Sequence, residues 1–344
     1  MNNNKKTLYI VIPCYNEEAA LPQTSEVMLQ KLTQLRGEGK ISERSRIVLI
    51  DDGSADSTWA FVAGLGERHA EYVGLRLSRN RGTQNAIMAG HDYALAHDAD
   101  AVITTDADLQ DDVSAIDRMV DELNRGADVV YGVRSKRAKD SFAKRYTAER
   151  FYKVMDWLGA GTINNHSDFR ALSRRALAAL AEYPERDMFI RGVVPMLGFN
   201  TAVVEYERSE RNAGETKYTA GSLMKLAITG ATSLSVKPLR MITVVGLAML
   251  VFAVITFVAA LLGMIIRGYP MLNWKITTTT IWFVGGIITL ALGIVGEYVG
   301  RAFSEAKNRP RYHIFETCVN ATGEIPNTDK KTKEAIGEVY EEEN

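Results

Sequence analysis

The strongest constraint on the fold is a regular alternation of two kinds of segment along residues 7–133. Short runs rich in Val, Ile, Leu and Tyr alternate with longer stretches whose apolar residues recur three and four positions apart. The short runs predict strands and the longer stretches predict amphipathic helices. Strands that alternate with helices predict an α/β domain, in which helices cover both faces of a mostly parallel sheet. The expected helices are 17–35, 56–70, 83–98 and 112–126, and a fifth strand is expected at 128–134.

Four polar clusters follow the first four expected strands, which are 7–13, 46–52, 72–78 and 100–106. In a parallel sheet, ligands bind beyond the carboxyl ends of the strands, so these clusters should meet in one site. The clusters read PCYNEE, DDGSADST, RNRG and DADLQDD. No GxGxxG or Walker A sequence occurs at these turns, which excludes those two kinds of nucleotide site.

The last cluster puts four carboxylates into the seven residues from Asp106 to Asp112. Residues two apart on an extended segment point to the same side, so Asp106, Asp108 and Gln110 would present oxygen atoms to one point. Mg²⁺ typically takes one or two carboxylates while substrate phosphates complete its shell. These three residues are therefore the expected ligands of Mg²⁺ or Mn²⁺. Asp111 and Asp112 are expected to favour the start of the following helix, an alternative that stays open for Asp106 and Asp108.

Two long runs, 241–266 and 276–296, contain no charged residue. Each is long enough to cross a bilayer, which takes about 20 residues, and soluble helices rarely run so long without a charged face. We therefore expect a two-helix transmembrane hairpin at 241–300, with buried core helices as the alternative. An amphipathic juxtamembrane helix is expected at 216–240, and a second basic amphipathic segment around 142–157 is also expected to lie in the membrane interface.

The distribution of basic residues predicts the orientation in the membrane. Lys and Arg flank both outer ends of the expected hairpin, while its connector holds only Arg267 and Lys275, so both termini should be cytoplasmic. The first apolar run is too short for a signal peptide, so residues 1–215 are expected to form a cytosolic domain. The two cysteines, Cys14 and Cys318, fit a reducing compartment without structural disulfides.

Net charge and the C-terminal tail bear on the possible binding partners of the protein. The net charge of −1 gives no indication of a nucleic-acid partner. Residues 301–344 form a polar tail that ends in EVYEEEN, and we expect this cytosolic tail to be partly disordered. A homo-oligomer through the membrane helices or the tail is compatible with the sequence.

The cluster DDGSADST could by itself be only a turn followed by a helix cap. Together with IPCYNEE and DADLQ, however, it makes the chain resemble the family 2 glycosyltransferases. In that family the first strand ends in a proline and an aromatic-Asn-Glu turn, the second in Asp-Asp-Gly-Ser and the fourth in Asp-x-Asp. The resemblance implies a Rossmann-like GT-A domain that binds a nucleotide sugar. It implies that the nucleoside is held by Pro13, Tyr15, Glu17 and Asp52, and that the diphosphate-bridging metal is bound by Asp108 and Gln110 with Asp106.

Further segments narrow the resemblance to the polyprenyl-phosphate glycosyltransferases, the group of dolichol-phosphate mannose synthase and bactoprenol glucosyltransferase. They are DADLQDD, YGVRSKR, DFRALSRRAL, ERDMFIRG, ERNAGETKY and VKPLR, and the matches run from about residue 8 to residue 311. This resemblance implies inverting transfer of a hexose to a polyprenyl phosphate on the cytoplasmic face of a bacterial inner membrane. The ERDMFIRG segment and the two-span tail are more similar to the bacterial glucosyltransferase branch, so UDP-glucose and undecaprenyl phosphate are the expected substrates. UDP-galactose, UDP-N-acetylglucosamine and GDP-mannose stay open as donors.

A polyprenyl phosphate presents a dianionic head group, which basic side chains, Arg above all, should bind. The candidates are Arg134, Arg145, Arg208, Arg211 and Lys217. A solvated surface charge is the alternative for each of them. Arg134 is also a catalytic candidate, together with Asp106 and Asp108, because it lies at the carboxyl end of an expected strand. Asp168 has two open interpretations, a contact to the sugar or a cap on a helix that begins near Ala171.

Catalysis should rest on positioning and charge neutralisation, because a phosphate monoester with a second pKa of about 6 is already ionised near neutral pH. A processive polysaccharide synthase is disfavoured, since such enzymes carry Gln-x-x-Arg-Trp and no Gln follows Gln110. A non-catalytic membrane scaffold is the least favoured interpretation, because Asp52, Asp106 and Asp108 are all present.

Overall fold

The computed structural model describes residues 5–134, 166–186, 188–207 and 274–319, together with some residues between 242 and 266. The chain divides into two compact units. The first comprises residues 1–140, 163–216 and 310–344, and the second comprises 141–162 and 217–309.

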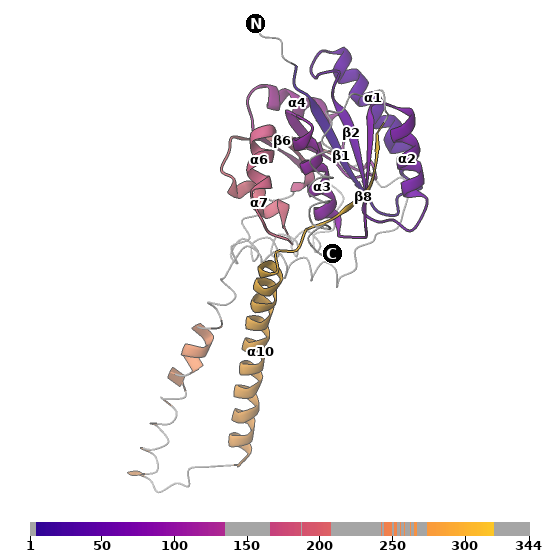
Figure 1. The fold of residues 1–344 in the computed structure, drawn as a ribbon. Helices are drawn as coiled ribbons and strands as arrows, with labels where there is room; N and C mark the ends of the chain where they lie inside the picture. The colour runs from indigo at the N-terminus through magenta and orange to yellow at the C-terminus, as the bar shows by residue number, and fades with distance from the viewer. Residues whose placement is uncertain are drawn as a thin grey trace, which may run out of the picture. The chain divides into compact units, whose positions relative to one another are not determined.

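The first unit contains a sheet of eight strands whose order is β7-β5-β6-β4-β1-β2-β3-β8 (Figure 1). The strands are β1 (Leu8–Cys14), β2 (Arg46–Asp51), β3 (Tyr72–Leu77), β4 (Ala101–Thr104), β5 (Val129–Arg134), β6 (His166–Ser173), β7 (Thr201–Tyr206) and β8 (Ile314–Val319). β6 runs antiparallel to both β4 and β5, and β8 runs antiparallel to β3, while the other pairs are parallel. The expectation of an α/β domain with a mostly parallel sheet is therefore confirmed.

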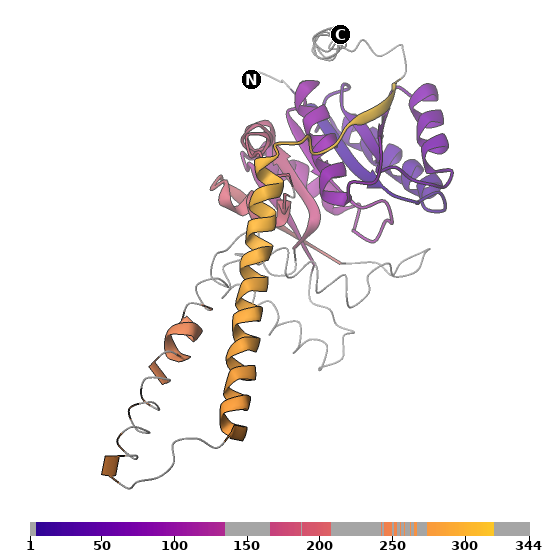
Figure 2. The same cartoon turned by 60° about the horizontal axis from the view of Figure 1, so that its bottom comes forward.

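Helices cover both faces of this sheet (Figures 1 and 2). They are α1 (Leu21–Gly37), α2 (Thr58–Arg68), α3 (Thr83–Ala96), α4 (Ala115–Asn124), α6 (Arg174–Ala181) and α7 (Ile190–Met196). Ile10 and Ile12 of β1 point into one core with residues of α1, α2 and α4, whereas Tyr9 and Val11 point into a second core with residues of α3, α6 and α7. This division follows from the two-residue period of a strand, which sends successive side chains to opposite faces.

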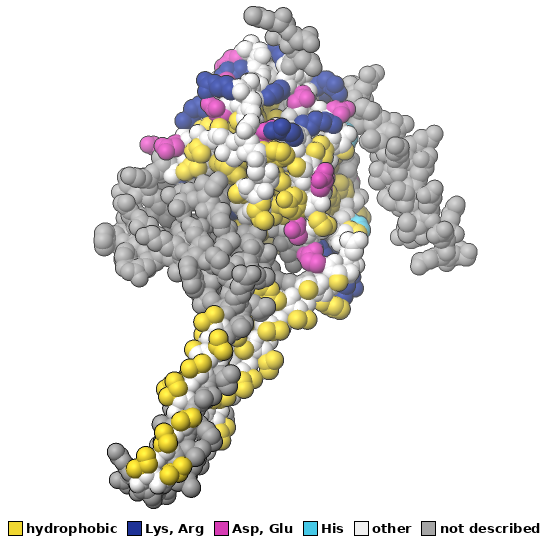
Figure 3. Space-filling model, turned by 90° about the vertical axis from the view of Figure 1, so that its left-hand side faces the viewer, with side chains coloured by type: hydrophobic (Ala, Val, Ile, Leu, Met, Phe, Trp, Pro, Cys, Tyr) yellow, Lys and Arg dark blue, Asp and Glu magenta, His cyan; other side chains and the backbone are white. Residues whose placement is uncertain are grey.

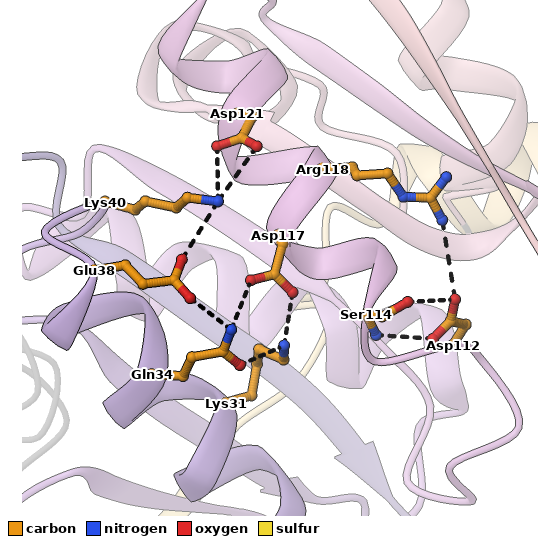
Figure 4. Close-up of polar contacts among 9 residues, drawn as sticks. All are labelled: Lys31, Gln34, Glu38, Lys40, Asp112, Ser114, Asp117, Arg118 and Asp121. Carbon is orange, nitrogen blue, oxygen red and sulfur yellow. Dashed lines mark hydrogen bonds and ion pairs between the residues drawn. The ribbon is translucent and has the colours of Figure 1, made fainter.

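Charged and amide side chains join α1 and the turn that follows it to α4 (Figure 4). Lys31 pairs with Asp117 at 2.6 Å, and Lys40 pairs with Asp121 at 3.1 Å. Gln34 lies between the two pairs and donates a hydrogen bond to Glu38 at 2.7 Å. These contacts connect the two helices on the solvent side, while their apolar faces pack on the sheet.

Strand β8 comes from the segment that the sequence analysis assigned to the tail at 301–344. It pairs with the edge strand β3, with Val73 opposite Val319, and Trp59 Nε1 donates to the Glu316 carboxylate at 3.0 Å. Tyr312 Oη donates to Asp92 at 2.5 Å just before the strand begins. Residues 314–319 are therefore an ordinary part of the sheet, while residues 320–344 lie outside the described part of the chain.

The second unit contains the long helix α10 (Trp274–Ala306). Within the described residues, one helical segment, Phe283–Ala306, is long and apolar enough to cross a membrane. Its side chains are mostly apolar and exposed, and Figure 3 shows mainly apolar side chains on the visible face of this helix. The described residues between 242 and 266 are helical and mostly exposed as well. Because the rest of that run is not described, the two-span hairpin stays a prediction, and the amphipathic segments at 142–157 and 216–240 lie outside the described residues.

Candidate active site

The turns that follow β1 and β2 are joined by hydrogen bonds. The backbone N–H of Asn16 donates to Ser54 Oγ at 2.9 Å, and the Asn16 side chain accepts from the N–H of Ala55 at 2.9 Å. The N–H of Glu17 donates to Thr58 Oγ1 at 2.9 Å. Asn16 has a positive φ of 52°, which Asn adopts more readily than most residues. The proposed nucleoside-binding residues Pro13, Tyr15 and Glu17 thus lie in or beside a turn that hydrogen bonds join to the Asp-Asp-Gly-Ser turn, and Tyr15 is exposed there.

Asp52 connects this surface to the turn after β3. Its two carboxylate oxygens accept hydrogen bonds from the backbone N–H groups of Arg81 at 2.7 Å and Gly82 at 2.8 Å. Burial raises the pKa of Asp52 to about 6, although these two hydrogen bonds act in the opposite direction. Gly53 has a φ of 69°, and a Cβ atom there would lie 2.7 Å from the backbone of Arg79. The two turns are therefore packed backbone to backbone, which only glycine permits at this position.

Asp106 and Asp108 lie in the turn that follows β4. The expectation of an extended segment is wrong here, because residues 107–109 form a turn and Leu109 has a positive φ of 52°. Asp108 Oδ1 accepts the backbone N–H of Gln110 at 3.2 Å, which is a hydrogen bond that Asp commonly makes in turns. Simple alternation along a strand therefore does not explain how Asp106, Asp108 and Gln110 are oriented.

The charge around Asp106 fits a bound cation. Burial, followed by the nearby carboxylates of Asp111, Asp168 and Asp108, raises the pKa of Asp106 to about 7, and Arg191 opposes this shift. Among the described residues, no group of three or more His, Cys, Asp or Glu side chains is arranged to hold a metal by itself. Two carboxylates and an amide are, however, a suitable partial set for Mg²⁺ or Mn²⁺ when substrate phosphates supply further oxygens. The residues present thus fit a divalent cation that binds together with a diphosphate.

The neighbouring residues Asp111 and Asp112 differ in their surroundings. Asp112 accepts the N–H of Ser114 at 2.8 Å and its hydroxyl at 2.7 Å, immediately before α4 begins (Figure 4). The expected helix-start role is confirmed for Asp112. For Asp111 it is wrong, because that carboxylate is buried and accepts the Tyr206 hydroxyl at 2.5 Å.

Arg134 lies at the end of β5, as expected, and contacts the same buried group. Its Nε donates to Tyr206 Oη at 3.1 Å, and its Nη2 lies 3.6 Å from Asp111 Oδ1. Burial lowers the pKa of Arg134, but Tyr206, Asp111 and Asp106 together raise it above its ordinary value. Arg134 is therefore a permanent cation close to Asp106.

Asp168 lies in β6 and is not a helix cap, since α6 begins at Arg174 with Ser173 as its N-cap. Arg170 Nη2 donates to Asp168 Oδ1 at 2.9 Å, and Arg191 binds both oxygens of the carboxylate. Gln84 of α3 is 3.4 Å away and accepts the N–H of Ile190 through its own oxygen. Burial by itself would raise the pKa of Asp168. Arg191, Arg170 and Gln84 together outweigh this effect, so the pKa lies well below its usual range.

The structure brings Asp106, Asp108, Arg134 and Asp168 to one edge of the sheet, the edge at which the turns after β1 and β2 also lie. Four of the predicted phosphate-binding residues lie outside the described part of the chain, namely Arg145, Arg208, Arg211 and Lys217. Sequence reasoning did not single out Arg191, Tyr206 or the buried role of Asp111. The segment ERDMFIRG, which contains Arg191, was the one sequence feature that pointed to this residue. No local pattern distinguishes Tyr206 from an ordinary strand residue.

Comparison with known proteins agrees with these features. Residues 9–180 match the family model of glycosyl transferase family 2. The chain is 41% identical over 340 residues to the uncharacterized glycosyltransferase YkoT of Bacillus subtilis, covering 99% of this chain and 100% of the relative. It is 37% identical over 314 residues to the prophage bactoprenol glucosyl transferase homolog of Escherichia coli K12, covering 89% and 97%. It is also 37% identical over 306 residues to the bactoprenol glucosyl transferase of Shigella phage SfX, covering 89% and 97%.

Among solved structures, the chain is similar to glucosyl-3-phosphoglycerate synthase from Mycobacterium tuberculosis, with a TM-score of 0.42 and 18% identity over 66% of this chain and 79% of the other. A TM-score this low carries no argument about the site. The family match and the relatives that align along almost the whole chain are decisive instead. The chain therefore belongs to glycosyl transferase family 2, in the polyprenyl-phosphate glycosyltransferase group that includes the bactoprenol glucosyl transferases.

Proposed function

We propose that this protein transfers a hexose from a nucleotide sugar to a polyprenyl phosphate, with inversion at the anomeric carbon. The best candidates are UDP-glucose as donor and undecaprenyl phosphate as acceptor, because relatives at 37% identity are named bactoprenol glucosyl transferases. The proposal rests mainly on one observation: acidic and basic side chains lie close together at one edge of the sheet. Asp106 lies among carboxylates that favour a cation, while Arg134 supplies a fixed positive charge nearby.

The donor would bind across the first two turns of the site. Tyr15 offers an exposed ring beside the turn that Asp52 fastens to Arg81 and Gly82. Asp106, Asp108 and Gln110 would hold Mg²⁺ or Mn²⁺, which when bound neutralises the charge of the departing nucleoside diphosphate. A rigid binding surface of this kind lowers the barrier by positioning the donor for a single attack.

The acceptor would be activated by placement and not by a strong base. Its phosphate is already ionised near neutral pH, since the second pKa of a phosphate monoester is about 6. Arg134 would hold one of its oxygens with a charge-assisted hydrogen bond. Asp168 is a weak base in this site because two arginines bind its carboxylate and lower its pKa. The nucleophile is therefore the phosphate oxygen, and its attack from the opposite face inverts the anomeric carbon.

The reaction would occur at a membrane surface, as a lipid-linked acceptor requires. The apolar, exposed segment Phe283–Ala306 supports a membrane anchor. We propose a bacterial inner-membrane protein with two spans at 241–300 and both termini in the cytoplasm. The catalytic domain would then face the leaflet on which nucleotide sugars are available.

The test uses membranes from cells that express the full chain. They are incubated with undecaprenyl phosphate, Mg²⁺ and one labelled donor at a time, namely UDP-glucose, UDP-galactose, UDP-N-acetylglucosamine or GDP-mannose. Label should enter the lipid fraction from one donor, and UDP-glucose is expected. The absence of labelled lipid with all four donors would overturn the proposal, and label from another donor would correct only the choice of sugar.

Two matched variants separate the proposed site from general damage to the domain. Asp108→Asn removes a proposed cation ligand and should reduce lipid labelling at least a hundredfold. Asp117→Asn makes the same chemical change on α4, where Asp117 forms a partly buried pair with Lys31 of α1. That control should keep close to wild-type labelling. Equal loss in the two variants would argue against a special role of Asp108.

A further inference from the structure

The side chains of Asp111, Tyr206 and Arg134 form a closed triangle of contacts. Tyr206 Oη donates to Asp111 Oδ1 at 2.5 Å and accepts from Arg134 Nε at 3.1 Å. Arg134 Nη2 lies 3.6 Å from the same Asp111 oxygen. The three residues come from the segment after β4 and from the ends of β5 and β7, so only the folded sheet brings them together.

Burial divides the triangle into a fixed part and an outward part. Asp111 is 5% exposed and Tyr206 is 2% exposed, whereas the Arg134 side chain is 22% exposed. A buried carboxylate is costly unless a cation and hydrogen bonds stay close to it. Asp111 therefore retains the guanidinium, and the ring of Tyr206 is itself held edge-on by Phe169 at a centroid distance of 5.2 Å.

The contacts with Asp111 and Tyr206 use only one side of the guanidinium. An arginine has five N–H donors on three nitrogens, and the triangle engages Nε and Nη2 while Nη1 takes part in neither contact. The partly exposed side of Arg134 is thus available to an oxyanion. A guanidinium that is already oriented loses less conformational entropy when it binds a phosphate than a free surface arginine does.

We infer that Asp111 and Tyr206 are positioning residues that hold the Arg134 guanidinium ready for the phosphate of the lipid acceptor. This inference rests on the proposed function, in which Arg134 binds that phosphate. Neither Asp111 nor Tyr206 touches the acceptor. They act through Arg134, so their loss should weaken acceptor binding and leave donor binding unchanged.

The test compares Tyr206→Phe with Tyr72→Phe in the full-length protein. Tyr72 is buried like Tyr206, and its hydroxyl donates to the backbone oxygen of Ser25 at 2.6 Å on another part of the sheet. Tyr72→Phe removes the hydroxyl that donates to Ser25, and Tyr206→Phe removes the hydroxyl that contacts both Asp111 and Arg134, so both variants should lose thermal stability. Only Tyr206→Phe should raise the KM for undecaprenyl phosphate, by about 3- to 10-fold, which is the effect of one hydrogen bond. Its KM for the nucleotide sugar should stay within about twofold of the wild-type value.

A double mutant identifies the route of the effect. Arg134→Gln should raise the acceptor KM more than Tyr206→Phe does, and adding Tyr206→Phe to Arg134→Gln should change it no further. If Tyr206→Phe changes the two KM values as Tyr72→Phe does, or adds its full effect to Arg134→Gln, the inference is wrong. Asp111→Asn gives a second variant for the same comparison if Tyr206→Phe does not fold.

Binding without turnover separates this inference from the proposed function. Calorimetric titration of the detergent-solubilised protein with undecaprenyl phosphate, in the absence of any donor, should show weaker binding for Tyr206→Phe and Arg134→Gln than for the wild type. If the wild type makes no glycolipid but this order of affinities is found, the proposed transfer fails and the positioning role stands. If Arg134→Gln binds the lipid as tightly as the wild type, the positioning inference fails even when transfer is observed.

Discussion

Arg191 binds both carboxylate oxygens of Asp168, with Nε 3.0 Å from Oδ1 and Nη2 2.7 Å from Oδ2. The two residues lie on different elements, α7 and β6, and the carboxylate is nearly inaccessible to solvent. This bidentate pair joins α7 to the sheet at the edge where the candidate active site lies.

Replacing Arg191 should therefore destabilise the protein. Arg191→Gln leaves Asp168 with Arg170 as its one arginine partner in the described residues, and we expect a loss of about 1 to 3 kcal/mol in the free energy of unfolding. Because the pKa of Asp168 is lowered in the folded state, its stabilising effect is present above about pH 4 and is lost as the pH falls below that value. The difference in melting temperature between wild type and variant should thus be large at pH 7 and shrink toward pH 3.

Arg125→Gln is the control for that measurement, since Arg125 pairs with Glu122 on the exposed surface of α4. Exposed pairs contribute little to stability. If Arg125→Gln lowers the melting temperature as much as Arg191→Gln, the buried bidentate pair has no special role.

For Asp52 we expect the opposite dependence of folding stability on pH. Its folded-state pKa of about 6 lies above the ordinary value of 3.8, so the folded protein binds the proton more tightly than the unfolded chain. The stabilisation from this group is present below about pH 4 and is lost as the pH rises through 6, an effect on the order of 3 kcal/mol. Asp52→Asn removes the titration. Its melting temperature relative to the wild type should be higher at pH 7.5 than at pH 4.5, and a difference that is independent of pH would contradict the assignment.

Gly53 should tolerate no side chain. Gly53→Ala puts a Cβ atom 2.7 Å from the backbone of Arg79 and also forces a non-glycine residue to a φ of 69°. Gly198→Ala has nearly the same φ, 68°, but open space around the new atom. Gly53→Ala should therefore lower the melting temperature further than Gly198→Ala and raise the donor KM, because the displaced turn carries the proposed nucleoside-binding surface. Similar melting temperatures and donor KM values in the two variants would show that the turns can move apart.

Removal of divalent cations should abolish transfer. The carboxylates around Asp106 repel one another, so a cation together with a nucleoside diphosphate should stabilise the protein and raise its melting temperature. Excess EDTA should stop lipid labelling, and added Mg²⁺ or Mn²⁺ should restore it. The increase in melting temperature on adding metal and nucleotide should be absent in Asp108→Asn. Full activity in excess EDTA would refute the proposed metal role.

The alternation of apolar runs predicted the α/β domain and the elements from β1 to β5, because burial of strands and amphipathic helices leaves a periodic pattern in the chain. The same pattern placed the polar turns after β1, β2 and β4 at one edge of the sheet. Asp52, Asp106 and Arg134 could be nominated in this way, since a residue at the end of a parallel strand has a known location.

Partners in space could not be predicted in the same way. Asp111 and Asp112 are adjacent and chemically identical, yet one is buried against Tyr206 and the other accepts the N–H of Ser114 just before α4 begins. Glu316 belongs to a segment with the composition of a tail. It lies beside Trp59 because this segment forms β8, which pairs with the edge of β3 and satisfies its backbone hydrogen bonds. Contacts between residues so far apart in the chain produce no periodic pattern or fixed spacing in the sequence from which they could be predicted. The local sequence therefore determined the elements and the site's location, whereas tertiary packing decided which charges are buried, paired and oriented.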